Sequence, residues 1–185
     1  MANSTGIVLI TGPPGVGKTT LVRKICANLS GVRKLQGFYT EEVRDESHQR
    51  IGFDVVTLAG QRGILARVQD PSENYLPCPK VGKYSVYCLD FDKVILPILN
   101  DNKEPSSSLW VIDEVGKMEL CSFPFEDALE ELIYCQVPLL ATIPQQGQSL
   151  PMVKLLKQQP GAVIYHVTES NRDALCATIT EYLTK

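Results

Sequence analysis

The sequence has 185 residues, 44% of them hydrophobic and 21% charged, which suits a single domain with one hydrophobic core over residues 1–185. Its 18 basic and 21 acidic side chains give a net charge of -3, which leaves no basic excess for a phosphate polymer and disfavours nucleic acid as a partner. No apolar run approaches the roughly 18 residues of a membrane span, and the first residues lack the pattern of a secretory signal, so we expect no membrane partner.

Alternating strand and helix patterns begin near the N-terminus and return in the second half of the chain. An apolar run at residues 7–11 is followed by a loop rich in glycine and proline, and then by a segment with one apolar helical face. Later strands are expected at residues 109–112, 137–143 and 162–167, with helices starting near Ser122, Ser149 and Ser170. Such alternation needs crossover connections, which predicts a mainly parallel central sheet with helices on both faces.

The segment between these two parts breaks the alternation. Residues 35–44 and 51–58 are rich in aromatic and β-branched side chains, and a polar turn separates them. This pattern predicts an antiparallel β-ribbon at residues 35–58, at the edge of the sheet. After it we expect a proline-containing surface loop at residues 70–80, a strand at 81–88, and a helix that is capped by Asp90 and kinked by Pro97.

The six cysteines are spread singly along the chain, without a C-x-x-C pair. This spacing argues against a zinc ribbon and against a redox dithiol. We expect reduced thiols that lie mostly in the core, and a cytoplasmic protein that could also be nuclear.

A phosphate-binding loop follows the first strand. The sequence G-P-P-G-V-G-K-T fits G-x-x-x-x-G-K-[ST] at every fixed position, and it precedes a helix as the motif requires. Backbone amides should bind phosphate oxygens, Lys18 should reach the β- and γ-phosphates, and Thr19 should place its hydroxyl on Mg²⁺. A turn that only joined a strand to a helix would not require lysine and threonine here. The expected nucleotide-binding residues are Gly12, Pro13, Pro14, Gly15, Val16, Gly17, Lys18, Thr19 and Thr20.

Two acids end the predicted strand at residues 109–112. At the carboxyl end of a parallel strand, Asp113 should face the phosphate loop and hold Mg²⁺, through water. Glu114 should point differently and could orient and deprotonate a water molecule. The alternative is a pair of acids that merely cap a turn.

Four further residues are candidates on weaker grounds. Thr142 ends the next strand and could contact the γ-phosphate or the attacking water, or could instead satisfy the turn at Pro144. Asn171 and Arg172 follow the last strand and could contact the base or ribose, or could simply start a helix. Lys117 could neutralise charge on the γ-phosphate as an arginine finger does, or could be a solvated side chain. Rival cations lie on the ribbon and just after it, at Arg44, Arg50, Arg62 and Arg67.

Several longer segments resemble the THEP1-type nucleoside-triphosphatase family, and in particular its vertebrate members. The segments peculiar to that family are G-F-Y-T-E-E-V-R at residues 37–44, R-I-G-F-D-V-V-T-L at 50–58 and V-I-D-E-V-G-K-M-E-L at 111–120. The motifs T-I-P at 142–144 and V-T-x-x-N-R at 167–172 complete a resemblance that covers nearly the whole chain.

This resemblance implies an α/β P-loop NTPase with a RecA-like core sheet of the ASCE type. It also implies slow, Mg²⁺-dependent hydrolysis of ATP, GTP and other nucleoside triphosphates to the diphosphate and phosphate. No motif in the sequence distinguishes one base from another. We expect the chain to act as a monomer, as slow members of this class can work alone.

Two other functions share parts of this pattern. A small-molecule kinase would need an acceptor site and a basic lid, for which residues 61–67 are a thin candidate, whereas Glu114 favours water as the acceptor. A GTPase switch would match D-x-x-G at Asp113 and Gly116, but it would also need a guanine-binding N-K-x-D motif. Asn102 and Lys103 are followed by Pro105 in place of the aspartate and come before the Asp113 strand, so this motif is missing.

Overall fold

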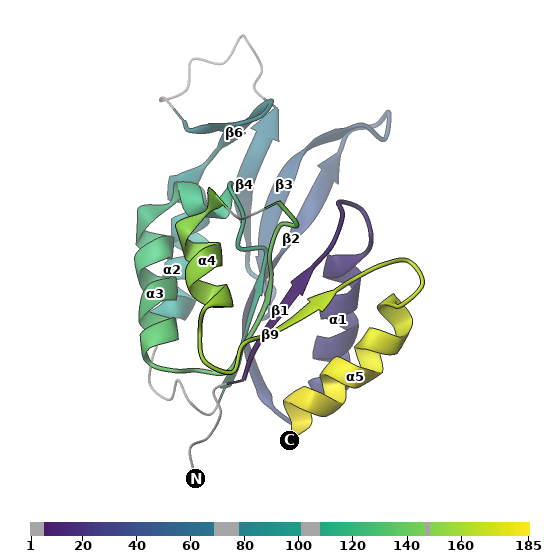
Figure 1. Ribbon diagram of the computed structural model, residues 1–185. Coiled ribbons are helices and arrows are strands. Elements are labelled where there is room, and N and C mark those ends of the chain that lie inside the picture. The colour runs from purple at the N-terminus through teal and green to yellow at the C-terminus, as the bar shows by residue number, and fades with distance from the viewer. Residues whose placement is uncertain (1–5, 69–77, 101–107, 147–148) are drawn as a thin grey trace.

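The computed structural model describes residues 6–68, 78–100, 108–146 and 149–185. In this part of the chain nine strands form one sheet, in the order β5-β6-β4-β3-β2-β7-β8-β1-β9 (Figure 1). The strands are β1 (Ile7–Thr11), β2 (Lys34–Arg44), β3 (Arg50–Thr57), β4 (Arg62–Val68), β5 (Lys80–Val81), β6 (Tyr84–Val86), β7 (Ser108–Asp113), β8 (Leu139–Thr142) and β9 (Val163–His166). The helices are α1 (Lys18–Leu29), α2 (Cys88–Leu99), α3 (Phe123–Tyr134), α4 (Pro151–Lys157) and α5 (Arg172–Thr184), with a short 3-10 helix η2 (Glu119–Cys121). Most of the predicted loop at residues 70–80 lies outside the described residues.

One half of the sheet is parallel. Strands β2, β7, β8, β1 and β9 pair in parallel, so their carboxyl ends share one edge of the sheet. A single strand, β8, separates β1 from β7. This order defines the ASCE type of P-loop fold and confirms the fold class predicted from the sequence.

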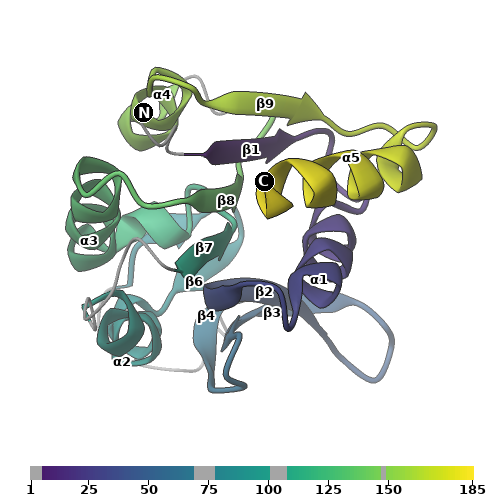
Figure 2. The same cartoon turned by 90° about the horizontal axis from the view of Figure 1, so that it is seen from below.

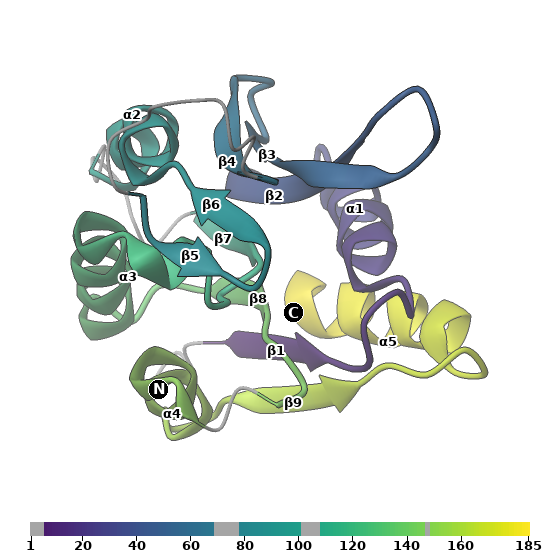
Figure 3. The same cartoon turned by 90° about the horizontal axis from the view of Figure 1, so that it is seen from above.

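The other half of the sheet is antiparallel, and it corrects the expected place of the ribbon. The predicted hairpin exists as β2 and β3, and its tip extends beyond α1 when the sheet is seen from above (Figure 3). The ribbon is not at the sheet edge, because β2 also pairs with β7 and the sheet continues through β4, β6 and β5. The sequence analysis missed β4, in which Gly63 and two arginines weaken the apolar pattern. It also merged β5 and β6 into one strand.

Helices cover both faces of the sheet, and the strands divide the core between them. Helices α2, α3 and α4 lie on one face, and α1 and α5 lie on the other (Figure 2). In β1, Ile7 and Leu9 face the first layer, while Val8 and Ile10 face the second. This alternation follows from the two-residue period of a strand and explains why residues 7–10 of the fully buried β1 are all apolar.

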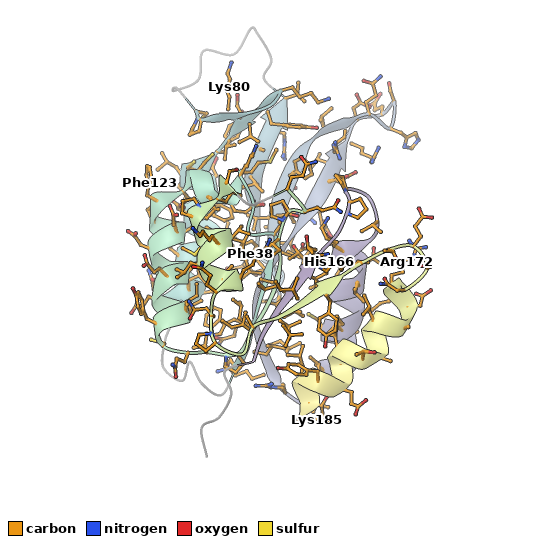
Figure 4. The ribbon with its side chains drawn as sticks, viewed as in Figure 1. Phe38, Lys80, Phe123, His166, Arg172 and Lys185 are labelled. Atoms are coloured by element: carbon orange, nitrogen blue, oxygen red, sulfur yellow. The ribbon has the colours of Figure 1, made fainter. Side chains whose placement is uncertain are left out.

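The first helix layer is centred on three buried aromatic rings. Phe38, Phe91 and Phe125 come from β2, α2 and α3, and their ring centroids lie 5.3 to 5.7 Å apart in edge-to-face geometry. Phe38 is labelled in the middle of the molecule in Figure 4. Strand β2 pairs in parallel with β7 and antiparallel with β3, so these contacts pack α2 and α3 against the strand that joins the two halves of the sheet.

Only one of the predicted helix caps is confirmed. The Ser122 hydroxyl accepts a hydrogen bond from the Phe125 amide at 3.1 Å at the start of α3. The other three helices begin without a side-chain cap, because packing of their apolar faces and not local capping sets their starts. Their N-cap positions are Tyr87, Leu150 and Asn171 in place of the expected Asp90, Ser149 and Ser170. Pro97 lies in the last turn of α2, which continues to Leu99.

The cysteines are free thiols, as expected, but they are less buried than we expected. Cys135 is exposed and the other five are half-buried, so none is a true core residue. Within the described ranges, no helix is long and apolar enough to cross a membrane.

Candidate nucleotide-binding and catalytic site

The phosphate loop joins β1 to α1 at the carboxyl edge of the sheet. Gly15 and Gly17 have φ angles of 77° and 101°, in the left-handed region that glycine adopts at little cost. The Lys18 ammonium lies back over the loop and donates to the carbonyl oxygens of Gly12 at 3.0 Å and Pro13 at 3.3 Å. The loop is therefore curved around the point where its lysine can meet a ligand.

The start of α1 is suited to an anion. Gly17 occupies the N-cap position without a side chain to bind the free amides, and the first turn contains no acid. The positive end of the helix dipole is thus left without a local counter-charge. Thr19 and Thr20 lie in this first turn, so all nine predicted loop residues are contiguous around it.

Asp113 ends β7 and is 2% exposed. One of its carboxylate oxygens, Oδ1, accepts a hydrogen bond from the Thr142 hydroxyl at the end of β8. The other, Oδ2, is buried and has no hydrogen-bond partner among the described residues. A buried acceptor without a donor is costly, and a bound cation would offset that cost.

The surroundings of Asp113 fit a magnesium ion. Burial raises the pKa of Asp113, while the hydroxyls of Thr142 and Thr19 and the charge of Lys18 oppose that rise. No group of three or more His, Cys, Asp or Glu side chains in the described part of the chain could hold a metal alone. Proteins commonly hold Mg²⁺ through one or two side chains, with water and substrate phosphates as the other ligands. The Asp113 carboxylate and the Thr19 hydroxyl match this pattern.

Glu114 follows Asp113 and is partly exposed. Burial raises the pKa of Glu114, the charge of Lys18 lowers it, and the charge of Asp113 raises it again. Because Lys18 acts on both acids, the phosphate loop and the end of β7 face each other across one site. The phosphate loop and the two acids therefore lie near each other, as their places in the sequence predicted.

A third acid, Glu119, was missed by the sequence analysis. Glu119 lies in η2, is 5% exposed, and its Oε2 accepts a hydrogen bond from the Gly116 amide at 3.2 Å. Burial and then the charge of Glu114 raise the pKa of Glu119 to about 8. The signal that could have found it is its place between the apolar side chains of Met118 and Leu120, which is unusual for a solvated acid.

The structure gives Thr142 a partner that neither sequence interpretation named. Its hydroxyl is fully buried and donates to Asp113. Thr142 therefore holds one carboxylate oxygen of Asp113 and leaves the other directed elsewhere.

The candidate cations differ in whether they are already paired. Lys117 is exposed, and its ammonium has no hydrogen-bond or ion-pair partner in the segments that the structure describes. The four arginines on β2, β3 and β4 are each paired with an acid on β2 or β3. These pairs are Arg44 with Glu42 at 2.5 Å, Arg50 with Glu42 at 2.8 Å, Arg62 with Glu41 and Asp54, and Arg67 with Asp54 at 2.5 Å.

Asn171 and Arg172 lie beside the phosphate loop, after β9. The Asn171 side chain accepts from the Thr168 amide at 2.8 Å and donates to the His166 carbonyl at 2.9 Å, so it closes its own loop. Arg172 donates to the Val16 carbonyl at 3.4 Å. His166 and Arg172 mark the two ends of this loop in Figure 4.

A pocket of about 380 Å³ opens between α1 and α5, next to the first turn of α1. An ion pair between Lys24 and Asp173, 3.4 Å apart, crosses the two helices here. The pocket is lined by Gly17, Thr20, Leu21, Lys24, Arg172 and Asp173. Its position beyond Thr20 suits the nucleoside part of a nucleotide whose phosphates lie on the loop.

Together these features define a class of protein. A phosphate loop after one parallel strand, and a buried carboxylate at the end of the strand two places away, are the two halves of the P-loop NTPase fold.

Comparisons with known proteins place the chain within this class. A family model described as NTPase matches residues 7–180. The cancer-related nucleoside-triphosphatase homolog of Bos taurus is 42% identical over 185 residues, which cover 95% of each chain. The crystal structure of THEP1 from the hyperthermophile Aquifex aeolicus matches with a TM-score of 0.81 and 35% identity, over 97% of this chain and 99% of that one. The solution structure of a human cancer-related nucleoside triphosphatase matches with a TM-score of 0.78 and 41% identity, over 96% of both chains.

This chain therefore belongs to the THEP1-type nucleoside-triphosphatase family. The resemblance noted in the sequence is confirmed over nearly the whole length.

The buried proton of Glu119 predicts how stability depends on pH. The pKa of Glu119 is about 8 in the folded chain and about 4.5 in the unfolded chain, so the folded state keeps a proton that the unfolded state loses. Its contribution to the free energy of unfolding is therefore full below about pH 4.5 and declines as the pH rises through about 8. In Glu119→Gln this decline should disappear, so the variant should gain stability relative to the natural chain between about pH 5 and pH 8. Urea unfolding at several pH values measures the difference, and identical pH slopes for the two chains would contradict the prediction.

Proposed function

We propose that the chain is a slow, Mg²⁺-dependent nucleoside-triphosphatase that hydrolyses ATP, GTP and related triphosphates to the diphosphate and phosphate. The observation that carries this proposal is the orphaned, buried Oδ2 of Asp113 beside a complete phosphate loop. The names of the relatives support the same activity, because those proteins are described as nucleoside-triphosphatases.

The phosphate loop would bind the triphosphate through backbone amides and the Lys18 ammonium. Thr20 would contact the α-phosphate, while Thr19 and Asp113 would hold Mg²⁺, with Thr142 keeping Asp113 in place. When bound, this ion would neutralise part of the charge on the phosphates. Lys18 has three donor protons, so it can exchange its carbonyl contacts for phosphate oxygens.

Glu114 would activate the attacking water. Its carboxylate accepts a proton from the water, whose oxygen forms a bond to the γ-phosphorus as the bond to the β-phosphate oxygen breaks. The β-phosphate oxygen leaves on the diphosphate, and the γ-phosphoryl group leaves as inorganic phosphate. The nearby Lys18 charge supports this role, because it favours the ionised form of Glu114 that can take the proton.

Lys117 is our candidate for the cation that stabilises charge in the transition state. It follows the acids in the loop after β7, and its ammonium is unpaired among the described residues, unlike the arginines of the antiparallel strands. A cation supplied by the same chain needs no second subunit. We therefore include a monomeric enzyme in the proposal.

The pocket between α1 and α5 would hold the base and ribose, and its lining suggests weak discrimination between bases. Its polar side chains include the exposed Lys24 and Asp173, which bind each other. A site discriminates strongly when buried polar groups are left unpaired by the wrong ligand, and this lining offers none. Asn171 stays in the proposal as a neighbour that fixes the loop carrying Arg172.

The two rival functions are less consistent with the geometry. The lid that a kinase would need was expected at residues 61–67, but most of that segment is β4, which pairs with β3 and β6. In a GTPase switch the glycine amide of D-x-x-G would bind the γ-phosphate, whereas the Gly116 amide binds Glu119.

The roles of Glu114 and Lys18 predict different defects. Glu114→Gln should bind Mg·ATP with near-normal affinity but lose about 10² or more in kcat, because it removes the proton acceptor. Lys18→Ala should weaken binding itself. Phosphate release and titration with a non-hydrolysable ATP analogue separate the two effects, and Glu131→Gln on the exposed side of α3 is a control. Near-normal turnover in Glu114→Gln would rule out Glu114 as the base.

The lining of the base pocket predicts broad substrate use. The values of kcat/KM for ATP, GTP, CTP and UTP should agree within about tenfold, since no buried group can reject the wrong base. Steady-state phosphate release with each nucleotide at equal Mg²⁺ measures them. A preference of about 10³ or more for one base would contradict this model of the pocket.

The role of Lys117 predicts that its removal lowers kcat by the same factor at every protein concentration. Lys117→Ala should lower kcat by about tenfold or more with little change in KM, because a charge made only in the transition state loses its partner. Lys154→Ala, on α4 at the opposite face, should have no effect. If the specific activity of the natural chain rose with its concentration, a second subunit would supply the missing cation and the monomer would be excluded.

A further inference from the structure

Two carboxyl groups close around Gly116 in the loop that follows β7. If Gly116 carried a Cβ atom, that atom would lie 2.6 Å from Oε1 of Glu114 and 3.0 Å from Oε2 of Glu119. Both carboxyl groups thus lie against the same glycine. A methyl group at this position would have to push the Glu114 carboxylate aside, so the absence of a side chain at Gly116 leaves room for both carboxyl groups beside it.

Glu119 is fixed in this arrangement by its surroundings. It is almost fully buried, and its Oε2 accepts the Gly116 amide hydrogen at 3.2 Å. No basic side chain within the described ranges pairs with it. A buried acid without a cation is stable only if it keeps hydrogen bonds and little charge.

We propose that Glu119 is a positioning residue for Glu114: its buried carboxyl group holds the Gly116 amide and restricts the Glu114 side chain to one orientation toward the phosphate loop. This inference rests on the proposed function, because it assumes that Glu114 activates water. Glu119 itself is only 5% exposed, so it would act through Glu114 and not by binding the substrate.

The charged groups around Glu119 are consistent with a neutral acid. Glu114 and Asp113 face it from the end of β7, and both charges oppose its ionisation. Cys121, on the same short helix, is a thiol whose pKa is raised by burial and by Glu119. Burial also raises the pKa of Glu114, and the charge of Lys18 opposes that rise, whereas no basic side chain opposes the rise at Glu119.

A protonated Glu119 can do what an ionised one cannot. A carboxylic acid has one donor as well as acceptor capacity, so it can accept from Gly116 and still present its own proton to the Glu114 carboxylate. An ionised Glu119 would instead repel Glu114. Positioning of this kind changes the rate and not the binding of substrate, because it acts only on the residue that takes the proton from water.

Three variants of the full chain test the proposal, with kcat at saturating Mg·ATP, affinity for a non-hydrolysable ATP analogue and thermal unfolding as readouts. Glu119→Met keeps the size of the side chain but removes the acceptor, and it should lower kcat by about tenfold to a hundredfold with unchanged affinity. Gly116→Ala should do the same by displacing the Glu114 carboxylate. Glu119→Gln resembles the neutral acid, so it should keep kcat within about threefold. The control is Glu131→Met on the exposed side of α3.

The pH profile separates positioning from a merely structural role. In the natural chain kcat should fall as the pH rises through about 8, because Glu119 then ionises, and in Glu119→Gln this fall should be absent. The proposal is overturned if Glu119→Met keeps the natural kcat, or if Glu119→Gln is as slow as Glu119→Met. If Glu119→Met does not fold, natural turnover in Gly116→Ala overturns it. If the positioning proposal is overturned but Glu114→Gln is inactive, the proposed function still stands. If Glu114→Gln is fully active, the assignment of Glu114 as the base is refuted as well.

Discussion

The site depends on the burial of one carboxylate, Asp113, at the end of a strand in the middle of the sheet. A charge in that position is costly, and three groups offset the cost: the Thr142 hydroxyl on β8, the Thr19 hydroxyl on α1 and the Lys18 ammonium at the end of the phosphate loop. Parallel pairing of β7, β8 and β1 brings these elements to the same edge. The order of the strands therefore determines the chemistry of the edge.

The antiparallel half of the sheet lies beside this edge but adds little positive charge to it. Its arginines are matched by acids on neighbouring strands, with Arg62 shared by Glu41 and Asp54. Exposed ion pairs of this type contribute little to stability, but they do determine which charges remain free for a ligand. Of the candidate cations for the site, Lys18 and Lys117 have no acidic partner among the described residues.

The sequence predicted the parallel core, the phosphate loop and the acid pair, because each has a local pattern that no other element shares. It did not predict β4, whose strand pairing comes from neighbours distant in the sequence, nor the N-cap residues of α2 and α5, although α4 and α5 begin within two residues of the starts expected near Ser149 and Ser170. The burial of Glu119 could not be predicted from the sequence either, since an acid on a solvated helix would have the same spacing. The partner of Thr142 could not be deduced either, because it depends on the register between β7 and β8.

The position of Lys18 has a consequence for the way a nucleotide enters and leaves. Its ammonium is not waiting in bulk water, since two carbonyl oxygens of its own loop already bind it. An arriving phosphate must displace these oxygens from the ammonium or share the ammonium with them. Association is therefore an exchange of partners and yields less free energy than the capture of an unbound cation. The same carbonyls are ready to take the lysine back when the product departs. Under the proposed function, a loop that solvates its own lysine would thus favour turnover over tight retention of the nucleotide.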